Sequence, residues 1–490
     1  MMMTPPSLPE RLDRLPWSRW HWRVVLALGI AWVLDGLEVT IVGSLGAVLE
    51  RPDTLGLTAV QVGWAGSLYV AGAVAGALAF GRMADRLGRK RLFMLTLLVY
   101  MAATVATAFT GSFATFALCR FFTGVGIGGE YAAINSAIDE LIPARVRGRV
   151  NLAINGSFWL GAALGAALSL VLLDPRVLGP VLGWRAGFLC GALLAVAVLL
   201  VRRHVPESPR WLATHGRAEE AEALMRRIEA AVLGRHSHGV FPVGAASAAM
   251  DRGRARIAAE AAPTKARPRV PTLREVAHVL VRRYPDRSTL VMTLMVSQAF
   301  FYNAIFFTYA LVLTRFMGVA QAEVGLYLFP FAAGNVLGPW LLGPLFDRIG
   351  RRVMIAATYG LSGVALALTG VAFLQGWLDA RSMTLCWAGV FFLASAAASS
   401  AYLTVSELFP LEMRALAISL FYAVGTGVGG FIAPALFGWL IDSGSRLQVS
   451  LGYALGALLV IGAAAVAWRH AVDAEGRPLE EIAPPLSGNS

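Results

Sequence analysis

The sequence predicts an all-α membrane protein in which twelve transmembrane helices form two pseudo-symmetric six-helix bundles. Of its 490 residues, 57% are hydrophobic and only 15% are charged, whereas charged residues make up roughly a quarter of a typical soluble protein. Twelve apolar stretches are long enough to cross about 30 Å of hydrocarbon. Motifs of the first half also recur in the second half, which indicates an internal repeat.

Each expected span contains about 20 mostly apolar residues, the length that crosses a bilayer as a helix. The first is too long for the apolar core of a cleavable signal. The spans are expected at residues 23–49, 60–82, 92–110, 113–139, 149–173, 183–203, 288–315, 323–346, 352–374, 383–406, 414–440 and 447–469. They divide the chain into an N-terminal segment (1–22), a first bundle (23–203), a loop (204–287), a second bundle (288–470) and a tail (471–490).

Positive charges gather in the loops on one side of the expected membrane, whereas the opposite loops carry scattered cations such as Arg51, Arg176 and Arg381. Basic loops face the cytoplasm. We therefore expect a multi-pass protein of the plasma (inner) membrane with both termini in the cytoplasm. This distribution accounts for the formal net charge of +12 without a nucleic-acid partner. The clustered cations are Arg86, Arg89, Lys90, Arg91, Arg145, Arg147, Arg149, Arg348, Arg351 and Arg352.

The loop at residues 204–287 is expected to form a cytoplasmic bridge between the two bundles. Its Ala-, Glu- and Arg-rich stretches at 217–233 and 250–262 suit short helices. The Gly-, His- and Ser-rich stretch at 234–247 is expected to be flexible, and the Pro and basic residues at 264–271 are typical of a linker. The loop does not form an independent enzyme domain in this interpretation, and the chain is not expected to be an enzyme.

Two motifs occur once in each half of the chain. The sequence GRMADRLGRKR at 81–91 recurs as GPLFDRIGRRV at 343–353, and ELIPARVR at 140–147 recurs as ELFPLEMR at 407–414. The motifs recur after 262 and 267 residues. Because these two spacings nearly agree, they indicate that the two halves are copies of one unit.

The repeated motifs predict an ionic gate at the cytoplasmic end of the bundles. The Asp of the first motif can meet a helix N-terminus of the other half, where the helix dipole favours an anion. Its Arg residues can bridge to Glu140 or Glu407. Partly exposed ionic contacts are individually weak, which suits a gate that opens and closes. The predicted gate residues are Asp85, Arg89, Glu140, Arg147, Glu207, Arg210, Asp347, Arg351, Glu407 and Arg414.

These motifs resemble those of the major facilitator superfamily, and the likeness covers nearly the whole chain. PESPRWL at 206–212 is similar to the sugar-porter branch, as is Arg120 with the glycines that follow it. GGEY at 128–131 resembles the metabolite:proton symporter branch, whose cargoes include organic acids and osmolytes. The resemblance implies the major facilitator fold and alternating access between its two bundles, with the substrate near the midplane.

Four charged residues lie well inside the expected spans, where a charge is costly and marks a candidate functional site: Asp35, Glu38, Arg120 and Glu130. Asp35 and Glu38 are three residues apart and share a helix face. At about 1.5 Å per residue, Glu38 and Arg120 lie at similar depth and are expected to pair. Proton-coupled sugar porters carry an acid and an Arg at matching positions, and protonation of Glu38 would release Arg120. Asp35 and Glu130 are further proton-coupling candidates, although Glu130 could instead be a structural partner for a cytoplasmic Arg.

Neutral polar residues of the seventh expected span are candidates for contacting substrate. Gln298 and Asn303 match positions that contact sugar in the sugar porters, although each amide could instead bond a neighbouring helix. Gly156 stands where those proteins carry a Gln, and residues 398–402 lack their Gly-Pro and Trp, so the pocket departs from a hexose site. The predicted substrate-binding residues are Gln298, Asn303, Tyr302, Asn335, Tyr402, Trp159 and Asn155.

The leading interpretation is a secondary active transporter that takes up a small polar metabolite, namely a sugar, an organic acid or a nicotinate-like aromatic acid. Protons are the expected coupling ion, and no cofactor is expected because Cys119, Cys190 and Cys386 are isolated and form no metal motif. The expected partners are a small-molecule substrate and the lipid bilayer, and the chain is expected to be a monomer. The alternatives are an efflux transporter of the same fold and a membrane sensor that does not transport.

Overall fold

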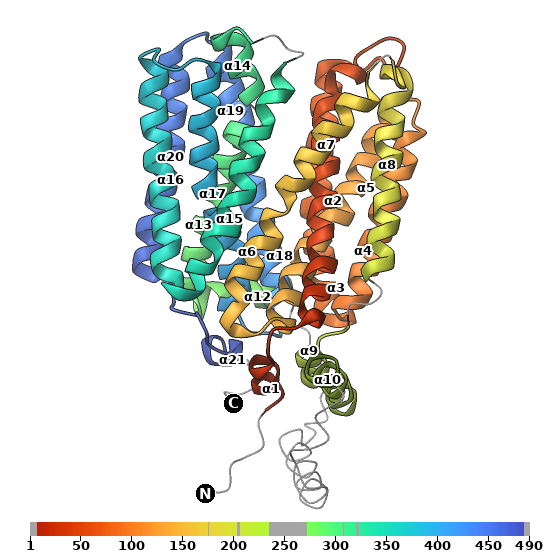
Figure 1. Cartoon of the computed structure of the whole chain (residues 1–490), viewed down its shortest axis with the longest axis vertical. Helices are drawn as coiled ribbons and strands as arrows, with labels where there is room; N and C mark the ends of the chain where they lie inside the picture. The colour runs from red at the N-terminus through yellow and green to blue at the C-terminus, as the bar shows by residue number, and fades with distance from the viewer. Residues whose placement is uncertain are drawn as a thin grey trace, which may run out of the picture.

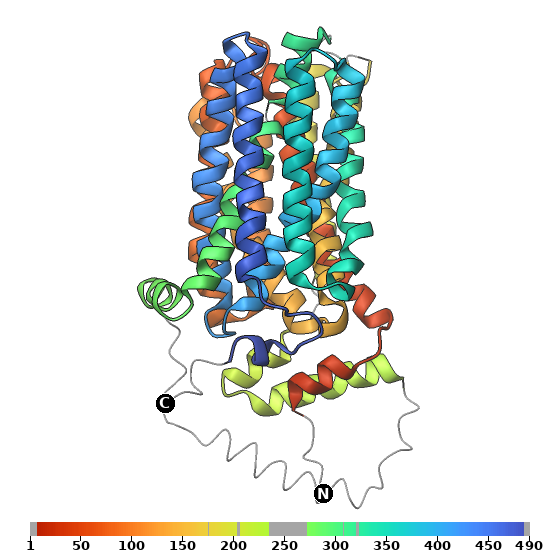
Figure 2. The ribbon, with the colours of Figure 1, turned by 90° about the vertical axis from the view of Figure 1, so that its left-hand side faces the viewer.

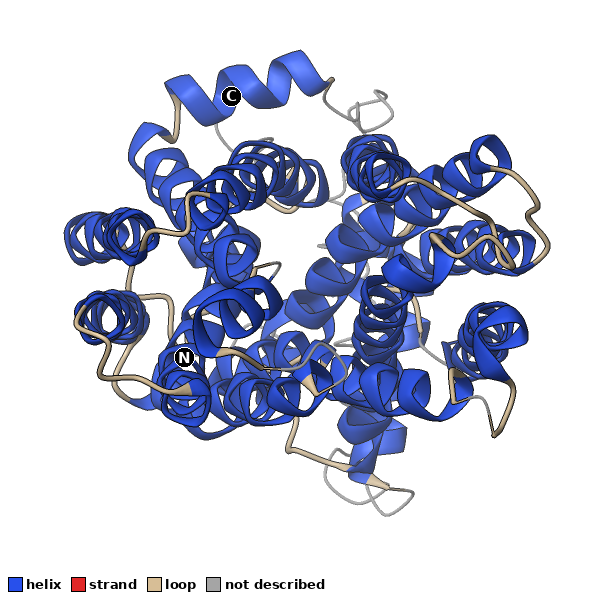
Figure 3. Ribbon diagram, turned by 90° about the horizontal axis from the view of Figure 1, so that it is seen from above, coloured by secondary structure: helices blue, strands red, loops and turns tan. Residues whose placement is uncertain are grey.

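The computed structural model describes residues 7–174, 176–202, 206–234, 272–306, 308–319 and 323–484. These residues form helices, turns and loops, and no strand occurs among them (Figure 3). The helices stand side by side as two bundles, one from each half of the chain (Figure 1). We call the end of the bundles that carries α1, α9, α10 and α21 the lower end, as it is drawn in Figure 1, and the opposite end the upper end.

The N-terminal bundle follows the apolar stretches of the first half. Ser18 and Ser112 begin two of its helices, because each side chain accepts a hydrogen bond from a backbone N–H of the first turn. The helices are α2 (Arg19–Leu49), α3 (Ala59–Leu87), α4 (Arg89–Ala108), α5 (Phe113–Leu141), α6 (Arg147–Gly156), α7 (Phe158–Leu172) and α8 (Gly179–Arg202). The fifth expected span is therefore two helices, α6 and α7, which meet at Ser157.

The C-terminal bundle repeats this arrangement. Its helices are α13 (Pro285–Phe306), α14 (Tyr309–Met317), α15 (Leu328–Arg348), α16 (Arg351–Leu374), α17 (Ala380–Leu408), α18 (Arg414–Gly425), α19 (Phe431–Asp442) and α20 (Arg446–His470). A π-helical turn, Thr426–Gly430, joins α18 to α19. The seventh and eleventh expected spans are thus interrupted, which the apolar pattern of the sequence does not reveal.

Ten helices among the described residues are long and apolar enough to cross a membrane, with α6 and α7 counted as one. Two further segments are also long enough to cross a membrane. One is α5, which carries four charged residues, and the other is formed by α18 and α19 joined through their π-helical turn. These two additions complete the twelve spans and confirm the predicted fold class. Broken helices at membrane depth are tolerated where neighbouring helices bury them.

Glycines allow the helices to pack closely. A Cβ atom placed on Gly124 of α5 would lie 2.0 Å from the carbonyl oxygen of Tyr69 on α3, and one on Gly128 would lie 1.9 Å from that of Ala73. Only glycine permits so close an approach of two helices. Gly88 and Gly350 have positive φ of 89° and 114° at the equivalent sharp turn of each half, which explains why glycine recurs there in the repeated motif.

Short helices cover the lower end. They are α1 (Leu8–Arg14), the 3₁₀ turn η1 (Ala144–Val146), α9 (Pro209–Thr214), α10 (Ala218–Leu233), α12 (Leu273–Arg282) and α21 (Leu479–Ile482). A further 3₁₀ turn, η2 (Val324–Tyr327), is not part of this set and precedes α15. The helix expected at 250–262 lies outside the described residues. The expected loop extended to residue 287, but α13 begins at Pro285, a residue well suited to the first turn of a helix.

Candidate functional site

A buried ion pair joins α2 to α5 inside the N-terminal bundle. Nη1 of Arg120 lies 2.5 Å from Oε1 of Glu38, and each side chain is 2% exposed. The guanidinium also lies 4.9 Å from the ring centre of Tyr69 and 5.8 Å from that of Phe188. An isolated charge in such a place is very costly, so each group depends on the other. The structure thus brings together the two residues whose depths we matched from the sequence.

Asp35 and Glu130, the other two coupling candidates, are also buried, each 1% exposed. Asp35 lies one turn from Glu38 on α2 and therefore on the same face of the helix. Glu130 lies ten residues beyond Arg120 on α5, about 15 Å along the axis. Glu130 is thus at a different level from the Glu38–Arg120 pair.

Four aromatic side chains meet between the two bundles. Trp32 of α2 stacks on Tyr131 of α5 with ring centres 4.6 Å apart. Trp32 also meets Tyr402 of α17 at 6.0 Å, and Tyr131 meets Tyr422 of α18 at 5.0 Å. We call these four residues the aromatic quartet. The sequence singled out only Tyr402, although Trp32 lies one turn before Asp35 and Tyr131 follows Glu130 directly.

A second contact between the bundles centres on Trp159 of α7. Its ring centre lies 5.9 Å from that of Tyr302 on α13, and 5.2 Å from those of both Phe306 and Phe331. The Tyr302 hydroxyl donates a hydrogen bond to Oδ1 of Asn335 on α15 at 2.8 Å. Three of the predicted substrate-binding residues are therefore neighbours.

Two of the remaining predicted amides, those of Asn303 and Asn155, donate hydrogen bonds to backbone carbonyl oxygens of their own helices. Nδ2 of Asn303 donates to the carbonyl oxygen of Ala299 at 2.6 Å. Nδ2 of Asn155 donates to the carbonyl oxygen of Asn151 at 2.8 Å. Gln298 is half-buried on α13. The structure thus places Asn155 in the N-terminal bundle, beside Asn151, rather than next to the amides of α13.

At the lower end, Asp347 of α15 caps a helix of the other bundle. Its two carboxylate oxygens accept hydrogen bonds from the backbone N–H groups of Gly148 and Arg149, at 3.0 and 2.9 Å. These N–H groups belong to the first turn of α6, where a helix has unsatisfied donors and a positive dipole end. This is the contact that the repeated motif predicted for its Asp.

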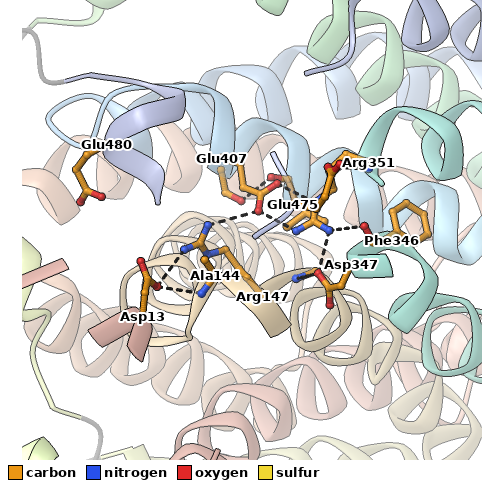
Figure 4. A network of polar contacts seen from close by, with 12 residues as sticks. Asp13, Ala144, Arg147, Phe346, Asp347, Arg351, Glu407, Glu475 and Glu480 are labelled. Atoms are coloured by element: carbon orange, nitrogen blue, oxygen red, sulfur yellow. Dashed lines mark hydrogen bonds and ion pairs between the residues drawn. The ribbon is translucent and has the colours of Figure 1, made fainter. Parts of the chain in front are cut away.

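Glu407 at the end of α17 connects two arginines, one from each bundle. Arg351 donates from Nε and Nη2 to the two carboxylate oxygens at 3.0 and 3.1 Å. Nη1 of Arg147 lies 3.6 Å from the same carboxylate. Arg351 also contacts Asp347 at 2.9 Å, so these residues form one continuous network (Figure 4). All four are almost completely buried, so the expectation of partly exposed and individually weak contacts was wrong for this network.

Asp13 of the N-terminal segment extends this network. Its carboxylate accepts a hydrogen bond from the N–H of Ala144 at 2.9 Å and lies 3.2 Å from Nη2 of Arg210. Arg210 in turn contacts Glu480 of α21 at 2.9 Å. The N-terminal segment, the loop helices and the C-terminal segment therefore meet at one point. The sequence pattern missed Asp13 and Glu480 because neither belongs to a repeated motif.

The other predicted gate residues lie around this network. Glu207 accepts a hydrogen bond from the N–H of Lys90 at 3.3 Å and so caps α4. Arg414 donates to the carbonyl oxygen of Phe409 at 3.1 Å, and Glu140 is buried near the end of α5. The side chains of Asp85 and Arg89 lie outside those that the structure describes.

Two bundles that meet at an ionic lower end and enclose buried polar groups define a membrane transporter of the major facilitator superfamily. The chain belongs to the sugar (and other) transporter family, whose sequence profile matches residues 39–485. Proteins of this family and fold are transporters rather than enzymes.

Individual relatives resemble the chain over nearly its whole length. The niacin transporter NiaP of Acinetobacter baylyi is 27% identical over 482 residues, which cover 97% of this chain and 99% of that protein. The 4-hydroxybenzoate transporter PcaK of Pseudomonas aeruginosa is 26% identical, with coverages of 89% and 92%. The proton:xylose symporter XylE bound to 6-bromo-6-deoxy-D-glucose has a similar fold, with a TM-score of 0.76, 19% identity and coverages of 95% and 98%.

Proposed function

We propose that the chain is a proton-coupled symporter that takes up a small polar metabolite by alternating access. The observation that carries this proposal is the buried ion pair between Glu38 and Arg120. A carboxylate in such a pair can take up a proton only when its Arg finds another partner or a different environment. Binding of a proton and a conformational change are therefore linked at this site.

We further propose an aromatic acid as the substrate. The aromatic quartet supplies faces and edges on which a planar ring can stack. The Tyr hydroxyl groups of the quartet can donate hydrogen bonds to a substrate carboxylate. Relatives named as niacin and 4-hydroxybenzoate transporters carry substrates of this kind. A sugar lacks both the aromatic ring and the negative charge.

In this proposal the lower end faces the cytoplasm of a cell bounded by a plasma (inner) membrane, so both termini are cytoplasmic. Basic residues of the loops at that end support this orientation. The chain works as a monomer, because each half of the gate comes from the same chain. It needs neither a cofactor nor a nucleic-acid partner in this proposal.

The direct test is uptake of labelled nicotinate, 4-hydroxybenzoate and xylose into proteoliposomes with an inward proton gradient. We expect accumulation of an aromatic acid above its external concentration, and loss of accumulation when a protonophore collapses the gradient. Protein-free liposomes control for diffusion of the neutral acid. Accumulation that persists without a gradient, or an exclusive preference for xylose, would overturn the coupling or the substrate proposal, respectively.

A further inference from the structure

The helix α12 lies across the axis of the bundles at their lower end. It projects from the side of the molecule (green, at the left of Figure 2). Val276 and Leu280 are buried against its neighbours, whereas Leu273 and Val281 are 39% and 67% exposed. Such an amphipathic helix, lying across the spans, is typical of the boundary between lipid and water.

An apolar groove separates α12 from the two spans next to it. The groove has a volume of about 350 Å³ and is open to the outside of the molecule. Its lining includes Ala277 and Leu280 of α12, Met292 and Thr293 of α13, and Leu420 and Phe421 of α18. A groove lined mainly by hydrocarbon at this level of the bundle suits a flexible hydrocarbon chain.

Positive charge lies at one corner of the groove. Arg282 and Arg283 are exposed where α12 turns into α13. No carboxylate of the described residues lies within 4 Å of either guanidinium. The nearby acids are engaged elsewhere, because Glu275 accepts a hydrogen bond from the Thr272 N–H at 2.6 Å and Asp286 lies 3.6 Å from His470.

We propose that this groove and its two arginines form a binding site for one anionic phospholipid. One acyl chain fills the groove between α12, α13 and α18, and the phosphate lies against Arg282 and Arg283. Guanidinium groups bind phosphate oxygens through paired hydrogen bonds. A net negative headgroup gains attraction to both arginines, whereas a zwitterionic headgroup carries its own cation and gains less.

The test measures which lipids remain bound to the full-length protein. Protein is equilibrated in detergent with equal amounts of phosphatidylglycerol and phosphatidylethanolamine of identical acyl chains, and native mass spectrometry counts the bound molecules. The variants are R282Q/R283Q, which removes the charge, and Ala277→Trp, which fills the groove. Their matched controls are R14Q/R23Q, two exposed arginines of the N-terminal half, and Ala230→Trp on the exposed face of α10.

We expect wild-type protein and both controls to retain phosphatidylglycerol in preference to phosphatidylethanolamine. The preference should fall by about fivefold for each groove arginine removed, and Ala277→Trp should lower retention of both lipids. Equal retention of the two lipids by wild type would overturn the headgroup site. An unchanged lipid count in Ala277→Trp would overturn the acyl-chain site. If R14Q/R23Q lost as much of the preference for phosphatidylglycerol as R282Q/R283Q, the preference would reflect general surface charge, and the proposal would be overturned.

Discussion

At the scale of single residues, the chain keeps most of its buried charge in pairs that join different helices. Glu38 and Arg120 join α2 to α5, and Glu407 holds Arg147 and Arg351 together across the bundles. Removing one member of a buried pair leaves the other charge without compensation, which typically costs about 3–5 kcal/mol. We therefore propose that these residues set the relative energies of the conformations between which the transporter alternates.

The aromatic quartet makes a prediction about substrate affinity. Replacing Trp32 by Ala removes its stack on Tyr131, and an aromatic contact is worth about 1 kcal/mol. We expect the affinity for an aromatic acid to fall by about fivefold, and Trp32→Phe to recover most of it. Isothermal titration calorimetry on purified protein measures both. Trp439→Ala, at a lipid-exposed position of α19, is the matched control, and an equal loss there would contradict the assignment.

At the scale of helices, α6 depends on the other bundle for its N-terminal cap. Replacing Asp347 by Asn weakens the hydrogen bonds from Gly148 and Arg149. Loss of a cap costs about 1 kcal/mol, so the first turn of α6 should exchange its amide hydrogens about fivefold faster. Hydrogen–deuterium exchange of peptides covering residues 144–156 checks this. Asp174→Asn, which changes a loop contact within one bundle, should leave this exchange unaltered.

The contact between α1 and α10 predicts a pH dependence. Arg11 lies 2.7 Å from both Glu222 and Glu229. Burial raises the pKa of Glu222, but its hydrogen bonds with Arg11 and Arg226 outweigh burial and lower it overall. The contact is therefore fully formed above the ordinary Glu pKa of about 4.3 and is lost as the pH falls through the lowered pKa of the folded state.

Spin labels at Glu10 and Ala230, both exposed, would report this contact as a distance between the two helices. We expect one narrow distance distribution at pH 7 and at pH 5.5, and a broad one below about pH 4. In Arg11→Gln the distribution should be broad already at pH 7. Broadening of the wild-type distribution between pH 7 and pH 5.5 would contradict this account of α1.

The sequence predicted the twelve-span fold because hydropathy and the repeated motifs carry information at the scale of whole helices. It also predicted that the Asp of the repeated motif meets a helix N-terminus of the other half, as Asp347 does, because the helix dipole favours an anion there. It did not predict Asp13 or Glu480, since an ionic contact between distant segments leaves no periodic pattern. Trp32 and Tyr422 were missed for a similar reason, because an aromatic residue in an apolar span looks like any other packing residue.

At the scale of the whole molecule, the structure has a closed lower end. The backbone of each bundle approaches the other there: a Cβ on Gly81 of α3 would lie 1.9 Å from Oγ of Ser419 on α18, and Gly343 of α15 faces Arg149 and Leu152 of α6. The first glycine of each repeated motif thus faces the other half. Opening of the lower end has to separate these contacts together with the network around Glu407.

Replacing Glu407 by Gln should shift the molecule towards an open lower end, because Arg147 and Arg351 lose their shared carboxylate. In a background without the native cysteines, Ser419→Cys reports opening through its reactivity with a water-soluble maleimide. We expect labelling at least about tenfold faster in the Glu407→Gln background. Ser450→Cys, buried within the C-terminal bundle, should keep its rate, and a parallel rise there would indicate general loosening instead.

The proposed transport cycle couples substrate movement to proton movement through Glu38. It is tested most directly by the pH change that an added aromatic acid causes outside wild-type and Glu38→Gln proteoliposomes, with protein-free liposomes as the baseline. We expect substrate addition to make the external medium more alkaline with wild-type protein, and Glu38→Gln to exchange substrate across the membrane without this pH change. Substrate entry without proton movement in wild type, or undiminished proton movement in Glu38→Gln, would contradict it.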